Sequence, residues 1–371
     1  MSDEGLPDWR IEKSAISASN LGYEIFFAGN DSINYHNKIF SKIYEIKWTA
    51  KARYGISTHW HYVKKEIRKV VEEIKPDIVH AHNVCSAKMM SEFGLPFIYD
   101  DHEYWSQYSR LKSEMGDKLC WKDKSPANVV KTLAKRIITN QHALRLWTSW
   151  EKDVVSSAPT ITVADIIVKE LKGIGGTDKV FVVPNYPMKF EVEKLKPRLH
   201  NNLSSVYAGS DGSLRKSPYR NIDGLPDIFT NRDIGELVII GWDEKSSSPR
   251  IKYTGFLSRQ DMFEEMSKHS IGLIPWKRHW AHYFVSPNKA YEYAHVGLFV
   301  MCTSSIIPVR ETLKDICATF EDYSDLSSQL EYFKENLDVL YKKRLRTFEF
   351  ARNNLVWENY EKNIFHAYQL C

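Results

Sequence analysis

The segment Ser286–Gly297 (Ser-Pro-Asn-Lys-Ala-Tyr-Glu-Tyr-Ala-His-Val-Gly) combines helix-starting residues with groups that bind anions. Serine is a preferred N-cap, and proline suits the first helical turn because its missing N–H costs nothing there. The sequence therefore predicts a helix whose free N–H groups and positive dipole end form an anion site. Glu292 follows about one turn later, where its carboxylate could reach hydroxyl groups of the same ligand. An ordinary capped helix of an α/β protein is the alternative.

Basic residues follow another strand-like run, Ser-Val-Tyr-Ala-Gly, which ends at Gly209. Arg215, Lys216 and Arg220 come shortly after this glycine. Guanidinium and ammonium groups pair well with phosphate oxygens. We expect this cluster to clamp a diphosphate, and a solvated basic loop is the alternative.

Histidines and acids gather at the ends of two predicted strands in the first half of the chain. His80 and His82 alternate along one strand, so both side chains point to one face. Asp101, His102 and Glu103 follow the next strand, at the edge where open α/β sheets bind ligands. A metal site is one interpretation, but a structural or substrate-contacting histidine pair is favoured, because no spacing such as HExxH occurs. His102 could also be a loop histidine with a purely structural role.

The composition and length indicate a globular protein large enough for two domains. The 371 residues are 43% hydrophobic and 26% charged, and two domains of this size can each bury a core. A net charge of +4 does not by itself indicate nucleic-acid binding. Five cysteines, odd in number and without a CxxC pair, argue against a disulfide framework or structural zinc and fit a reducing cytoplasm. No run approaches the roughly 18–20 apolar residues of a membrane span, and no signal-peptide core is visible.

Two surface segments combine basic and aromatic residues. They lie at 47–69, which includes Lys64, Lys65 and Trp60, and at 276–280. Such segments can lie on anionic membranes. A solvated helix face with core aromatics is the simpler interpretation, and nucleic acid is a weaker one because no recognition fold accompanies the charge.

Helix-like and strand-like segments alternate along the chain, which is typical of parallel sheets. The expected helices are 10–21, 59–74, 86–93 and a long final helix, 348–368. The expected strands are 23–28, 78–82, 96–100, 158–163, 180–183, 205–209, 236–241, 251–256, 270–276 and 298–301.

Several of these segments resemble motifs of retaining glycosyltransferases of family 4. Residues 287–297 are similar to the family's "PNKxxEYxxxG" helix, which follows a strand ending in a proline. Residues 8–13 (Asp-Trp-Arg-Ile-Glu-Lys) are similar to "DPRIEK", residues 75–82 to "kPDvvHaH", and residues 98–103 to "vYDxHE". The motifs occur in the family's order between about residues 8 and 368.

The resemblance implies an α/β fold of the GT-B type, with two Rossmann-like doubly wound domains facing each other across a cleft. We expect an acceptor-binding domain at 1–190, a nucleotide-sugar-binding domain at 191–345, and a C-terminal helix at 346–371 that crosses back to the first domain. Residues 1–7 have no strand pattern, although the first strand of a doubly wound sheet is central. We expect an incomplete start of the chain, or otherwise a gap in the sheet.

The resemblance also implies site residues. His102, with Glu103 and Asp101, would lie at the transferred sugar, and Glu292 would bind the ribose. The expected donor-binding residues are Gly209, Arg215, Lys216, Gly255, Phe256, Ser286, Asn288, Lys289 and Glu292. A second glutamate that many relatives carry eight positions before Glu292 is replaced here by Phe284, which bears on the choice of donor sugar.

The function that follows is a retaining hexosyltransferase-type glycosyltransferase acting by front-face displacement. It would move a sugar from a nucleotide-sugar donor to a glycan or lipid-linked acceptor in cell-surface polysaccharide or glycoconjugate synthesis. No metal or other cofactor is expected, because basic residues and a helix end serve as the clamp. The expected location is cytoplasmic, with peripheral contact to the inner membrane face. A non-catalytic sugar-nucleotide-binding or partner-binding protein and a sugar-nucleotide epimerase are the alternatives.

Overall fold

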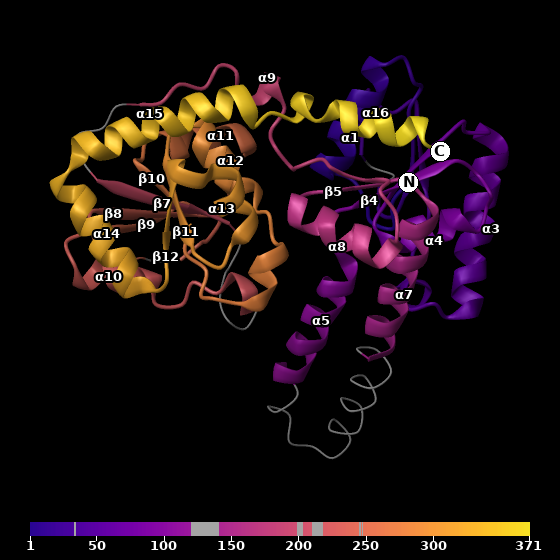
Figure 1. The fold of residues 1–371 in the computed structure, drawn as a ribbon, viewed down its shortest axis with the longest axis horizontal. Coiled ribbons are helices and arrows are strands. Elements are labelled where there is room, and N and C mark those ends of the chain that lie inside the picture. The colour runs from indigo at the N-terminus through magenta and orange to yellow at the C-terminus, as the bar shows by residue number, and fades with distance from the viewer. Residues whose placement is uncertain (33–34, 120–140, 199–202, 210–217, 245, 247) are drawn as a thin grey trace. The chain divides into compact units, whose positions relative to one another are not determined.

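The computed structural model describes residues 1–32, 35–119, 141–198, 203–209, 218–244, 246 and 248–371, with side chains 112, 113, 115–119 and 218 left out. The chain forms two compact units (Figure 1). Unit 1 comprises Met1–Pro184 and Tyr360–Cys371, and unit 2 comprises Asn185–Asn359. The division after Pro184 lies a few residues before the expected boundary at 190.

Unit 1 contains two parallel sheets. The larger has the strand order β3-β4-β5-β6, and β1 pairs with β2 in the smaller. The strands are β1 (Phe26–Gly29), β2 (Lys42–Glu45), β3 (Val79–His82), β4 (Phe97–Asp101), β5 (Thr160–Thr162) and β6 (Val180–Val182). The helices are α1 (Trp9–Asn20), α2 (Ala50–Arg53), α3 (Ser57–Ile74), α4 (Val84–Ser91), α5 (Trp105–Leu119), α7 (His142–Ser157), α8 (Asp165–Gly175) and α16 (Glu361–Gln369).

Local signals explain the helices that carry site residues in unit 1. Asp8 caps α1, because its side chain accepts hydrogen bonds from the backbone N–H groups of Arg10 and Ile11. Glu151 of α7 does the same for α5, accepting from the N–H groups of Trp105 and Ser106. Helices α5 and α7 pack side by side (Figure 1). These caps fix the start of α1, which carries Arg10, and the start of α5, which follows β4.

The first four residues lie between β1 and β3. The Ser2 N–H donates to Ala28 O, while the Met1 amino group donates to His80 O and the His82 N–H donates to Met1 O. Ser2 and His82 form an isolated parallel bridge. Within the described chain, this short pairing is what joins the two sheets of unit 1.

Unit 2 is a second Rossmann-like unit, with one parallel sheet in the order β12-β11-β10-β7-β8-β9. The strands are β7 (Ser204–Ala208), β8 (Glu236–Ile240), β9 (Ile251–Tyr253), β10 (Ile271–Ile274), β11 (Phe299–Thr303) and β12 (Cys317–Phe320). The α-helices are α9 (Lys189–Val192), α10 (Leu225–Asn231), α11 (Arg259–Ser267), α12 (Asn288–His295), α13 (Ile307–Leu313), α14 (Tyr323–Glu335) and α15 (Leu337–Asn354). Short 3-10 turns are η3 (Pro218–Arg220), η4 (Trp280–Phe284), η5 (Lys314–Ile316) and η6 (Trp357–Asn359).

Strands β7, β10 and β11 are buried along their whole length, as expected for strands covered on both faces of a parallel sheet. The predicted α/β fold with two Rossmann-like units is therefore confirmed. The single long helix predicted at 348–368 is wrong. Helix α15 ends at Asn354, and the fully buried Trp357 donates its N–H to Pro187 O before α16 begins at Glu361. Burying this indole interrupts the helix.

Candidate functional site

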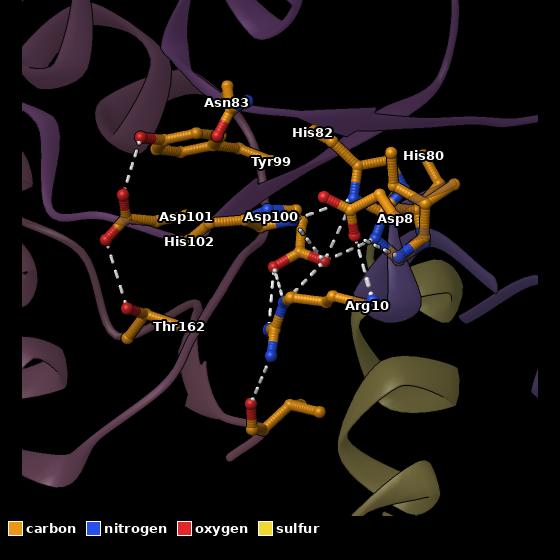
Figure 2. Close-up of polar contacts among 12 residues, drawn as sticks. Asp8, Arg10, His80, His82, Asn83, Tyr99, Asp100, Asp101, His102 and Thr162 are labelled. Carbon is orange, nitrogen blue, oxygen red and sulfur yellow. Dashed lines mark hydrogen bonds and ion pairs between the residues drawn. The ribbon is translucent and has the colours of Figure 1, made fainter. Parts of the chain in front are cut away.

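Unit 1 holds a cluster of three histidines around one carboxylate (Figure 2). Oδ2 of Asp100 lies 3.1 Å from His80 Nε2, 3.3 Å from His82 Nδ1 and 3.4 Å from His102 Nε2. His82 Nδ1 also lies 2.9 Å from His102 Nε2. Asp100 is fully buried, so the chain must supply every partner of its charge. The predicted common face of His80 and His82 is present, since their rings stack 4.3 Å apart.

Arg10 neutralises this carboxylate. Its Nη2 lies 2.7 Å from Asp100 Oδ1 and its Nε lies 3.0 Å from Oδ2, and Nη1 donates to Val183 O. Burial alone would raise the pKa of Asp100, but Arg10 and then His102 outweigh it and hold that pKa well below its usual range. Asp100 is therefore ionised at neutral pH.

The three histidines around Asp100 differ in the direction of their pKa shifts. Burial lowers the pKa of His80, and burial together with the nearby His80 lowers the pKa of His82 further. Burial also opposes charge on His102, but Asp100 outweighs it and raises the pKa of His102. His102 is the histidine of the cluster best able to hold a proton near neutral pH. It can offer a charged hydrogen-bond donor to an oxygen of a bound sugar.

Asp101 and Glu103 do not share this arrangement. The strand alternation turns Asp101 to the other face of β4, where it accepts hydrogen bonds from Tyr99 and Thr162, both at 3.0 Å (Figure 2). Burial raises the pKa of Asp101 to about 6. Glu103 is exposed. Of the three expected catalytic residues, the structure places only His102 in the cluster.

Ligand atoms of His80, His82 and Asp100 lie within 4.8 Å of one another, as the ligands of a metal ion do. However, the Arg10 guanidinium already contacts both oxygens of Asp100. A fixed positive charge at that distance opposes a second cation. The cluster therefore fits a hydrogen-bonding role better than a metal centre.

In unit 2, helix α12 begins at Asn288 with Pro287 as its N-cap and without a side-chain cap. The N-cap predicted at Ser286 is wrong, because the Ser286 hydroxyl is 2.8 Å from the hydroxyl of Tyr291 instead. The first backbone N–H groups of α12 are thus left for another acceptor, and Asn288 is exposed. An uncapped helix start of this kind binds anions.

Lys289 is held at this helix start by aromatic rings. Its Nζ lies 4.2 Å from the ring centroid of Tyr207 and 5.4 Å from that of Trp276, both within cation–π range. A Cβ on Gly209 would come within 2.4 Å of Nζ, so any larger residue there would displace the end of the lysine. Burial, with some repulsion from Arg220, lowers the pKa of Lys289 to about 7.

Arg220 supplies a second cation beside Trp276, with its guanidinium carbon 5.8 Å from the ring centroid. Its Nε is buried and has no hydrogen-bond partner. Over the described ranges, neither Arg220 nor Lys289 forms an ion pair with a carboxylate. Two partly buried cations that form no ion pair with a described carboxylate, next to an uncapped helix start, are an arrangement that an anionic ligand would complete.

Glu292 lies on α12, one turn beyond Lys289, and is only 8% exposed. Its Oε1 accepts a hydrogen bond of 2.9 Å from Arg259 of α11, which also pairs with Glu191. Oε2 accepts no hydrogen bond from the described part of the protein and remains able to bind hydroxyl groups.

The remaining expected donor-binding residues differ in exposure. Gly255 has a φ of +69°, which favours glycine, and Phe256 after it is 94% exposed. Arg215 and Lys216 lie outside the described residues.

Arg10, Tyr207, Trp276 and Arg259 were not assigned site roles from the sequence. Arg10 and Asp100 do lie in the segments 8–13 and 98–103, but their pairing spans 90 positions. The aromatic contacts of Lys289 likewise join segments that are distant in sequence. The positions of charged residues in the sequence do not indicate which aromatic rings lie beside Lys289.

No family model matches this chain, and no curated protein matches its sequence. Solved structures match it along nearly its full length. Sucrose-phosphate synthase from Thermosynechococcus elongatus matches with a TM-score of 0.71 and 10% identity, covering 97% of this chain and 92% of that chain. Anabaena HepE in complex with UDP-glucose matches with a TM-score of 0.70 and 10% identity, covering 100% and 98%.

WaaG, a glycosyltransferase involved in lipopolysaccharide biosynthesis, matches with a TM-score of 0.62 and 13% identity, covering 97% of each chain. In the described residues, the helices are too short or too polar to cross a membrane. At these identities the likeness concerns the fold, and the chain has the GT-B fold of two Rossmann-like units.

Proposed function

We propose that this protein is a glycosyltransferase that takes a sugar from a nucleotide-sugar donor. The observation that carries the proposal is the pair of cations Lys289 and Arg220, which lack carboxylate partners within the described chain and lie at the uncapped start of α12. The fold supports the proposal, because the matching structures include the glycosyltransferase WaaG and HepE in complex with UDP-glucose.

In the proposed donor complex, the diphosphate rests on the backbone N–H groups at Asn288 and Lys289. The Lys289 ammonium and the Arg220 guanidinium stabilise the charge that grows on the leaving diphosphate. Glu292 Oε2 accepts hydrogen bonds from the ribose hydroxyls, while the hydrogen bond from Arg259 orients the carboxylate. Phe256 offers a ring face to the nucleobase.

For the reaction itself, we propose membership of glycosyltransferase family 4 and a retaining, front-face displacement without a covalent intermediate. His102 donates a hydrogen bond to an oxygen of the transferred sugar or the acceptor, and Asp100 keeps it charged. The donor is a nucleotide hexose, and the acceptor is a glycan or a glycolipid of cell-surface polysaccharide synthesis. The protein would work in the cytoplasm, in peripheral contact with a membrane.

We further propose that no metal is required, since the cations of unit 2 meet the diphosphate directly. Activity should then survive EDTA. Complete loss that Mg²⁺ or Mn²⁺ restores would contradict this part of the proposal and would return attention to His80, His82 and Asp100.

The test of the function is a thermal-shift screen with UDP-glucose, UDP-galactose, GDP-mannose and the free nucleotides. A donor at 100 times its Kd stabilises the folded state by about 2.7 kcal/mol, which raises Tm by several degrees. Donors that shift Tm are then tested for nucleotide release with and without a glycan acceptor. A shift without release indicates a non-catalytic binder, and no shift with any nucleotide would refute the proposed donor site.

A further inference from the structure

In unit 2, the carboxylate of Glu292 is connected through one arginine to a second carboxylate, that of Glu191. Arg259 is the first residue of α11, and its Nη1 donates to Glu292 Oε1 at 2.9 Å. Its Nε donates to Glu191 Oε1 at 2.5 Å. The guanidinium of Arg259 therefore lies between two acids, one on α9 and one on α12. The two contacts join segments that are 68 and 33 positions apart, so spacing along the sequence does not indicate them.

Glu191 is held in place by its own helix. Its Oε2 accepts a hydrogen bond of 2.7 Å from the backbone N–H of Met188, as the third residue of a helix does in a capping box. Its side chain is only 6% exposed, so water contributes little to the solvation of its charge. Glu191 is thus a fixed acceptor for Arg259 and not a mobile surface group.

Arg259 has a choice between these two acids. The planar fork of a guanidinium matches both oxygens of one carboxylate, and this bidentate pairing is the strongest that an arginine forms with an acid. In the structure the fork is instead shared between Glu191 and Glu292. Its contact with Glu292 is to Oε1, and Oε2 accepts no hydrogen bond from the described residues. The Arg259 side chain is 38% exposed, so it has room to turn.

We propose that Glu191 is a positioning residue for donor binding, which holds Arg259 away from the second oxygen of Glu292 and so leaves Oε2 open to the ribose hydroxyl groups of a nucleoside diphosphate. Without Glu191, the guanidinium turns to pair with both oxygens of Glu292, and the ribose must then displace an ion pair. Glu191 itself does not contact the ligand. This inference rests on the function proposed above, and it adds the group that keeps the ribose site open.

The charges of the three side chains favour this role over a purely structural one. A bidentate pair between Arg259 and Glu292 would by itself join α11 to α12 and neutralise both groups. The structure instead places a second, largely buried carboxylate beside the same guanidinium. Two acids around one base are costly to bury, because one negative charge lacks its own partner within the three. Arrangements of this kind are more common at functional sites than in structural ion pairs.

The test compares the affinities for UDP and GDP with those for their 2′,3′-dideoxy forms, which lack both ribose hydroxyl groups. Calorimetric titration of the parent should show, for at least one base, a ribose form that binds roughly tenfold or more tightly than its dideoxy form. The neutral amide of Glu191→Gln accepts more weakly from Arg259, so this ratio should fall below about threefold. The affinity for the dideoxy form should not change. Glu193→Gln removes an exposed acid of the same segment and should keep the parent ratio.

Substitutions of Arg259 separate positioning from a structural role. In an Arg259→Met background, Glu191→Gln should have no further effect on the ratio, because no guanidinium remains to move. The loss of the acceptor for the Met188 N–H should still lower Tm there. Arg259→Lys is the second background, in case Arg259→Met does not fold. An ammonium group cannot pair with both oxygens of Glu292 in the bidentate manner, so Glu191→Gln should again change the ratio little.

The possible outcomes distinguish this inference from the function on which it rests. A parent ratio that Glu191→Gln retains would overturn the inference alone, and so would equal losses of affinity for the ribose and dideoxy forms. An effect of Glu191→Gln that persists undiminished in both Arg259 backgrounds would overturn it as well. If the parent binds no nucleoside diphosphate, the proposed donor function fails together with the inference. If the parent binds ribose and dideoxy forms equally, the ribose assignment of Glu292 fails with it.

Discussion

Replacing Lys289 by methionine should make the protein more stable and its donor binding weaker. Methionine keeps the length and apolar contacts of the side chain over Tyr207 and Trp276 but removes the charge. In the folded protein, burial first and Arg220 second lower the pKa of Lys289 from 10.5 to about 7. A displacement of this size corresponds to at most roughly 4–5 kcal/mol by which folding disfavours the charged form.

The sign of the pH dependence follows from the same displacement. Between pH 7 and 10.5 the unfolded chain holds a proton on this lysine that the folded chain has released. Stability therefore rises with pH across this window in the parent protein, and the cost of burying the charge is fully present below pH 7. Lys289→Met should abolish this part of the slope and should raise Tm at pH 6.

Binding should change in the opposite direction. A charged hydrogen bond to phosphate is worth roughly 1.5–3 kcal/mol, so Lys289→Met should weaken UDP-glucose binding by roughly 10- to 150-fold. In the parent protein, affinity should fall as pH rises above about 7, because the neutral amine attracts the diphosphate less. Calorimetric titration at pH 6, 7 and 8 measures both effects.

Lys342→Met is the matched control, since Lys342 is an exposed lysine of α15 in the same unit. It should change neither Tm nor affinity appreciably. The reasoning is refuted if Lys289→Met binds UDP-glucose, UDP-galactose and GDP-mannose as the parent does, or if it destabilises the protein at pH 6.

Three further substitutions test other parts of the site. Glu292→Gln should weaken donor binding by roughly 1.5–3 kcal/mol, since a charged acceptor to ribose is lost; unchanged affinity for every nucleotide would remove the ribose assignment. His102→Ala should lower kcat by roughly 10²-fold with donor affinity and Tm nearly unchanged; a loss of affinity at normal turnover would make His102 a binding residue only. Glu151→Gln tests the pH dependence of stability. Burial, with Asp101 nearby, raises the pKa of Glu151 from 4.5 to about 8. The folded parent therefore holds a proton that the unfolded chain releases, and its stability should fall as pH rises from 4.5 to 8. Glutamine does not titrate, so the variant should show a shallower loss in urea unfolding between pH 5 and 8. Its single amide oxygen can accept only one of the two hydrogen bonds that cap α5, so its stability at pH 5 should be lower than that of the parent.

The sequence was most informative where one physical requirement acts along a short stretch. Buried parallel strands such as β11 need a continuous apolar run, so their positions were predicted to within one or two residues. Helix α3 was predicted because Trp60, Val63 and Ile67 recur at helical spacing, and these residues are buried.

The sequence was least informative where one side chain has more than one possible partner. Ser286 is a good N-cap by composition, but its hydroxyl pairs with Tyr291. Asp101 was expected to follow a strand but is the last residue of β4, and strand alternation turns it away from His102 toward Tyr99. Propensity and spacing do not specify such choices, because the partner that wins is decided by tertiary packing.

The order of the segments in unit 1 has a consequence for how the protein is made. Unit 2 is continuous in sequence, whereas unit 1 needs Tyr360–Cys371, which a ribosome delivers after all of unit 2. Until then β6 lacks the contact from Asn363, and His80 lacks the hydroxyl of Tyr368. Unit 1 therefore cannot complete its fold until α16 has been synthesised. During translation, unit 2 can complete its own core before unit 1 does.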